Sequence, residues 1–102
     1  PVFCLGEFLR VVTHPRIFDP PTPADEACEV LAGILASPSV RVLVPRDRHW
    51  NLLRDAVGEG EVTGNLVFDA QIVALCRESG VSQLLTEDRD FGRFARLDVT
   101  RL

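Results

Sequence analysis

Residues 64–91 constrain the fold of this chain more than any other part of the sequence. Asn65 is a suitable N-cap for a helix, and Gly80 is a suitable residue to end it. Residues 83–86 are apolar in the middle and bounded by polar residues, which fits a short buried parallel strand. The sequence therefore predicts a helix, a turn and a strand, with two aspartates just beyond the carboxyl end of the strand.

Asp69 is the informative residue of this predicted helix, because its side chain should face the core. It lies roughly 160° around the helix from Gln71, which with Glu78 marks the polar side. An ionised carboxylate on the apolar side is costly unless a cation or hydrogen-bond donors meet it. Two interpretations stay open: a structural pairing with the helix N-terminus and a buried Arg, or a functional acid.

The composition fits one globular domain. The 102 residues are 46% hydrophobic and carry a formal net charge of −4, which does not indicate a nucleic-acid binder by charge alone. Cys4, Cys28 and Cys76 are too widely spaced for a zinc site, so we expect small core residues in a reducing cytoplasm. No signal peptide or membrane-length apolar segment is recognisable.

Short strands and helices alternate along the rest of the chain, which predicts a parallel α/β sheet. The side chains of Trp50, Leu53 and Val57 are expected on the buried side of their helix. Thr22 is the expected N-cap of the second helix. The predicted elements are helices at 2–14, 23–36 and 46–57, a mobile loop at 58–64, a helical turn at 92–96, and strands at 40–44 and 98–100.

Glu7 is a second carboxylate on an apolar helical face. An ion pair with Arg10 three residues later is the simpler alternative, but two inward carboxylates on two separate helices favour a functional role. With Asp69, Asp88 and Asp90, Glu7 completes an acidic set that contains no His, Cys or Ser. Carboxylates alone suit Mg²⁺ or Mn²⁺, and such ions promote phosphodiester hydrolysis.

Three segments of the chain resemble the PIN-domain ribonucleases, in particular the VapC-type toxins of bacterial toxin–antitoxin pairs. They read GEFLRVVTHPRIF at 6–18, NLVFDAQIVALCRESG at 65–80 and LLTEDRDF at 84–91. The resemblance implies a PIN-like three-layer α/β/α fold over residues 1–102. It also implies a Mg²⁺- or Mn²⁺-dependent endoribonuclease that cleaves RNA, is inhibited by a cognate antitoxin and forms a homodimer.

The same resemblance assigns roles to individual residues. The implied catalytic residues are Glu7, Asp69, Asp88 and Asp90, the implied metal ligands are Glu7, Asp69 and Asp88, and the implied supporting residues are Thr86 and Asn65.

One feature of the family has no counterpart in this sequence. The family's first catalytic Asp ends a leading strand, and no such strand or Asp precedes Glu7. We therefore expect an N-terminally truncated domain: a fragment, a misplaced gene start, or a unit completed by another chain. The strands at 40–44 and 83–86 would then each present an unpaired inner edge. The alternative function is a catalytically inactive PIN-like fragment that acts as a partner-binding module.

Overall fold

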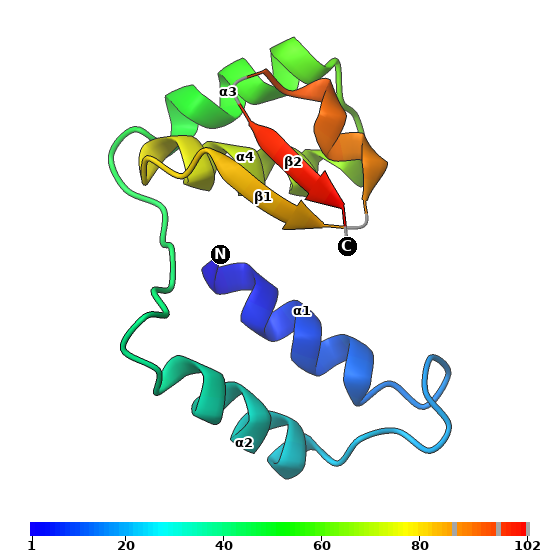
Figure 1. Cartoon of the computed structure of the whole chain (residues 1–102). Helices are drawn as coiled ribbons and strands as arrows, with labels where there is room; N and C mark the ends of the chain where they lie inside the picture. The colour runs from blue at the N-terminus through cyan, green and yellow to red at the C-terminus, as the bar shows by residue number, and fades with distance from the viewer. Residues whose placement is uncertain (87, 96, 102) are drawn as a thin grey trace. The chain divides into compact units, whose positions relative to one another are not determined.

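The computed structural model describes residues 1–86, 88–95 and 97–101. These residues form two compact units, Pro1–Val42 and Leu43–Leu102, and each unit is described by itself. Figure 1 shows their helices and strands. The first unit contains α1 (Val2–Val12) and α2 (Ala24–Leu35); the second contains α3 (His49–Gly60), α4 (Leu66–Glu78), β1 (Gln83–Thr86), the 3-10 helix η1 (Arg89–Arg93) and β2 (Asp98–Arg101).

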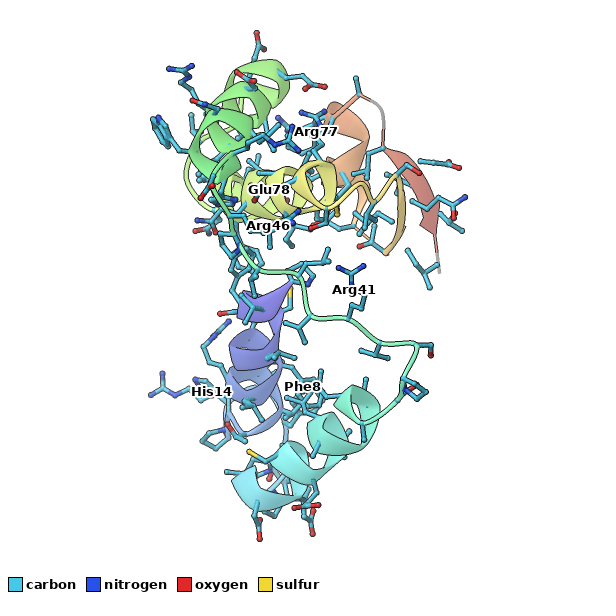
Figure 2. The ribbon with its side chains drawn as sticks, turned by 90° about the vertical axis from the view of Figure 1, so that its left-hand side faces the viewer. Phe8, His14, Arg41, Arg46, Arg77 and Glu78 are labelled. Atoms are coloured by element: carbon cyan, nitrogen blue, oxygen red, sulfur yellow. The ribbon has the colours of Figure 1, made fainter. Side chains whose placement is uncertain are left out.

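In the first unit, α1 and α2 pack against each other. Phe8 lies on the side of α1 that faces α2 (Figure 2). Ala27 is the buried residue of α2, whereas the apolar side chains of Val30 and Ile34 are exposed. Pro23, and not the predicted Thr22, occupies the N-cap position.

In the second unit, α4 lies between α3 and the two strands (Figures 1 and 2). The sequence of α4 is rich in small and branched apolar residues, so it can be covered on several sides. Its buried residues are Ala70, Ile72, Val73, Ala74, Leu75, Cys76 and Glu78. The prediction of three core cysteines is therefore right for Cys76 and wrong for Cys28, which is exposed.

β1 and β2 form a parallel pair in which Gln83 is opposite Asp98 and Thr86 is opposite Arg101. The predicted strands at 83–86 and 98–100 and the parallel class of the sheet are confirmed. Because parallel strands end at the same edge of a sheet, the chain that follows Thr86 begins at the carboxyl edge. The Gly80 backbone has φ of +73°, as expected for a glycine that ends a helix.

The predicted strand at 40–44 is wrong, since this segment has no regular secondary structure. Val40, Val42 and Val44 alternate along it as a strand pattern requires, but all three are exposed. A strand needs a hydrogen-bonded neighbour, and within the described residues the only pairing of β1 is with β2. The alternation of residues 40–44 is therefore that of a strand, but no described residues pair with this segment.

The predicted buried side of α3 is also wrong at Trp50, whose surface is 64% exposed. The buried residues of this helix are Ala56 and Gly60, and Gly60 lies against the side chain of Phe94. Trp50 lies about 120° around the helix from the buried Ala56, on a side of α3 that is exposed. The helix continues to Gly60 and ends at Glu61, in a left-handed conformation with φ of 50°, so residues 58–60 are helical and not part of a loop.

The helical turn predicted at 92–96 begins earlier, because η1 spans Arg89–Arg93. Arg96, the predicted end of that turn, is outside the described residues. In the part of the chain that the structure describes, no helix has the length and apolar character needed to cross a membrane.

Glu78 is buried, with 6% of its surface exposed, although the sequence predicts it on a polar side of α4. Its two carboxylate oxygens accept hydrogen bonds from the backbone N–H groups of Arg46 and Arg48, each at 2.8 Å, and Arg46 Nη2 donates to the Glu78 carbonyl at 2.7 Å. Figure 2 shows Glu78 and Arg46 side by side. The carboxylate thus fixes the chain just before α3. Helical periodicity within α4 could not reveal this partner of Glu78.

Burial opposes the ionisation of Glu78, but the backbone donors of Arg46 and Arg48, with the charges of Arg46 and His49, lower its carboxyl pKa below the usual value. We expect Glu78→Gln to lower the unfolding temperature by several degrees near pH 7, because the amide nitrogen would face a backbone N–H. A lowered folded-state pKa gives stability that is present above the unfolded pKa of about 4.3 and is lost at lower pH. Thermal unfolding at several pH values, with the exposed Glu29→Gln as control, checks this. A gap in unfolding temperature between the wild type and Glu78→Gln that grows as the pH falls would contradict it.

Candidate metal centre

Three aspartates from two parts of the second unit meet in one acidic cluster. Asp69 is in the first turn of α4, Asp88 follows β1, and Asp90 is in η1. One carboxylate oxygen from each of the three lies within 4.8 Å of the other two. We call Asp69, Asp88 and Asp90 the acidic cluster.

Short-range hydrogen bonds arrange the two acids after β1. Thr86 Oγ1, at the end of β1, accepts a hydrogen bond from the Asp88 backbone N–H at 3.1 Å. Asp88 is the N-cap of η1, and its Oδ1 accepts a bond from the Asp90 N–H at 2.8 Å. Two successive side-chain-to-backbone bonds therefore turn the chain, so that alternate residues carry their carboxylates to the same place.

The negative charges of Asp88 and Asp90 disfavour the ionised form of Asp69. Asp69 is half-buried, and burial raises the pKa of its carboxyl, with further contributions from the negative charges of Asp88 and Asp90. The positive charge of Arg93 opposes these effects. Like charges at this separation are relieved either by protonation or by a bound cation.

Arg93 borders the acidic cluster at the end of η1. Its Nε lies 3.9 Å from Asp90 Oδ1, and its Nη1 donates a hydrogen bond to the Gly60 carbonyl at 3.4 Å. The sequence offers Arg93 as one of several arginines that could contact RNA, by position only and without a ranking. The available signal was its position three residues after Asp90, a spacing at which helical side chains meet.

The acidic cluster fits a hard divalent cation. Its donors are all carboxylate oxygens, the ligands that Mg²⁺ and Mn²⁺ prefer. Oxygen ligands on an octahedral Mg²⁺ are about 3–4 Å apart, so oxygens within 4.8 Å would need only a small closing movement. Asp69, Asp88 and Asp90 are therefore the described residues that could hold such an ion together.

The structure does not bury Glu7, which belongs to the first unit. Its carboxylate accepts two hydrogen bonds from Arg10, at 3.2 and 2.9 Å, and both side chains are exposed. These bonds lower the pKa of the Glu7 carboxyl. The inward orientation expected from the apolar face is thus wrong, because a nearby guanidinium meets the carboxylate at the surface. Its role as a metal ligand stays a prediction.

Asn65 occupies the N-cap position of α4 as predicted. Its backbone is in the right-handed helical region, and its side chain makes no capping hydrogen bond. Its supporting role at the acidic cluster, like that of Thr86, stays a prediction.

Helices with a short parallel sheet and acids at the sheet's carboxyl edge define a small α/β protein with a candidate metal centre. The chain belongs to the PIN domain family, whose model matches residues 1–97. The predicted family and the PIN-like α/β fold class are therefore confirmed.

Relatives within this family are similar over most of the chain. Ribonuclease VapC43 of Mycobacterium tuberculosis and VapC ribonuclease Mb2897 of Mycobacterium bovis are each 37% identical over 93 residues, or 91% of this chain and 63% of the relative. Ribonuclease VapC48 of Mycobacterium tuberculosis is 36% identical over 92 residues, or 90% of this chain and 63% of the relative. The chain thus spans less than two thirds of the length of these curated relatives.

Proposed function

We propose that this chain is part or all of a cytoplasmic, Mg²⁺- or Mn²⁺-dependent endoribonuclease toxin that cleaves RNA phosphodiester bonds and is inhibited by a cognate antitoxin. The observation that carries the proposal is the acidic cluster, found in a chain of the PIN domain family whose relatives are named ribonucleases. Asp69 and Asp88 are the proposed metal ligands within the cluster, Asp90 is a further catalytic acid, and Glu7 is a proposed ligand from the first unit.

Each residue of the acidic cluster is held in position in its own way, and together they would bind a cation. Asp69 projects from the most buried helix, so its position is fixed by packing. Asp88 and Asp90 are held by the Thr86 hydroxyl and the Asp88 carboxylate through backbone bonds. A divalent cation in such a site polarises a phosphate oxygen and lowers the pKa of a bound water, which supplies the nucleophile for hydrolysis.

Metal-dependent RNA cleavage tests this proposal. The 102-residue chain, and a longer form that includes any residues encoded in frame upstream, are each incubated with mixed RNA and Mg²⁺, Mn²⁺ or EDTA. We expect cleavage by at least one form in either metal and none in EDTA. Cleavage by neither form, or cleavage that persists in EDTA, would contradict the proposal.

The acidic cluster also indicates the chemistry of the proposed antitoxin. Three neighbouring carboxylates, in a chain of net charge −4, favour a partner segment that carries Arg or Lys. Exposed apolar side chains such as Trp50, Val30 and Ile34 offer further contact area for this partner or for a second copy in a homodimer. Co-purification with the product of the neighbouring gene, with salt-sensitive binding, is the expected result.

These exposed apolar side chains also support the second candidate, a catalytically inactive PIN-like module that binds a partner. The two functions differ in one result, because the inactive module would form the complex but would not cleave RNA in either metal.

A further inference from the structure

We propose that Arg93 contacts the RNA phosphate beside the acidic cluster and so positions the substrate. This inference rests on the proposed ribonuclease function and adds a residue to it. Arg93 comes from the same short helix as Asp90 and lies at the rim of the cluster, with its side chain 43% exposed.

The bonds of Arg93 leave its guanidinium able to take a further partner. Its distance to Asp90, 3.9 Å, is the longest of the ion pairs among the described residues, whereas Arg10–Glu7 and Arg77–Glu59 are at 2.9 Å. Its bond to Gly60 is also long. For Nη2 of Arg93, the described residues supply no partner. Arg presents five donors in a planar fork, which matches two oxygens of one phosphate.

The other arginines with described partners are engaged more tightly. Arg77 pairs with Glu59 and donates to the Ala95 carbonyl at 2.7 Å, and Arg46 donates to the Glu78 carbonyl at 2.7 Å. Neither has an ion pair with the acidic cluster among the described interactions. Arg93 therefore combines two properties that an RNA contact needs: closeness to the acids and weak existing bonds.

Charge balance gives the physical reason for a cation at this position. Three carboxylates outweigh one divalent ion by a single negative charge, so a cluster loaded with metal would still repel an RNA phosphate. The guanidinium of Arg93, which lies beside Asp90, would offset that remaining charge. A phosphate bound there would face both the guanidinium and the acidic cluster.

The test uses Arg93→Gln and Arg93→Lys, with Arg54→Gln as control because Arg54 is exposed on α3. Binding of a short labelled single-stranded RNA is followed by fluorescence anisotropy at several salt concentrations in Ca²⁺, with the RNA checked intact afterwards. Mn²⁺ binding without RNA is measured separately by paramagnetic resonance.

We expect Arg93→Gln to weaken RNA binding about tenfold, as for loss of one charged hydrogen bond, and to reduce the salt slope by about 0.7. Its Mn²⁺ affinity should be unchanged or higher, because a nearby positive charge is removed. Arg93→Lys should keep the salt slope with weaker binding, and Arg54→Gln should match the wild type.

Unchanged RNA affinity and salt slope in Arg93→Gln would overturn the inference. Parallel loss of Mn²⁺ binding would also overturn it, because Arg93 would then be a structural support for the acids. Failure of the wild-type protein to bind either Mn²⁺ or RNA would instead be evidence against the proposed function itself, and the inference would fall with it.

Discussion

Replacement of Asp69 by Asn is expected to lower metal-dependent RNA cleavage by on the order of 10² to 10³, the typical effect of losing one preorganised electrostatic group. Asn keeps the shape of the side chain but removes the charge that would bind the cation. Initial cleavage rates are compared in the form of the protein that cleaves RNA. The exposed Asp55→Asn on α3 is the matched control and should retain the wild-type rate.

The same substitution should not weaken the fold. Because burial and the charges of Asp88 and Asp90 raise the Asp69 pKa, removal of its charge should leave the unfolding temperature unchanged or raise it. Lower cleavage with equal or higher stability is the expected combination. A protein that cleaves as well after Asp69→Asn as after Asp55→Asn would show that Asp69 is not a metal ligand.

Leu75→Ala should destabilise the second unit by about 2–5 kcal/mol, the range measured for truncating fully buried leucines. Leu75 is 0% exposed and is one of the two largest fully buried side chains of the described residues. Truncation would leave a cavity beside α4, the helix that lies between α3 and the strands (Figure 1). The free energy of unfolding is measured by urea denaturation followed by circular dichroism.

Leu85→Ala provides the matched control for that measurement. Leu85 lies on β1 and is 63% exposed, so the same change in side chain should alter the free energy of unfolding by less than about 0.5 kcal/mol. Equal losses from the two substitutions would mean that α4 is not the centre of the core.

The sequence predicted those features that depend on residues close together in the chain. The Asn65 and Gly80 signals located α4, and the apolar run before Thr86 located β1. Asp88 and Asp90 follow that strand directly, so their place at the sheet edge also followed from local order. Asp69 could be predicted as a member of the same acidic set because helical periodicity placed its side chain away from Gln71.

Features that depend on distant partners could not be predicted in the same way. Glu78 is buried because backbone donors 32 and 30 positions earlier meet it, and helical periodicity contains no sign of them. Trp50 is exposed because the buried side of α3 is the one that carries its small residues, Ala56 and Gly60. The segment at 40–44 has a strand pattern, but pairing requires a neighbour that a local pattern does not specify.

Crystals of the protein grown or soaked with Mn²⁺ test the central claim most directly, because anomalous scattering locates the ion independently of any assay of activity. We predict a Mn²⁺ peak within coordination distance of carboxylate oxygens from Asp69 and Asp88, with Asp90 beside it. A Mn²⁺ peak held by other residues, or no peak between these aspartates at a concentration that saturates cleavage, would contradict the proposed metal centre.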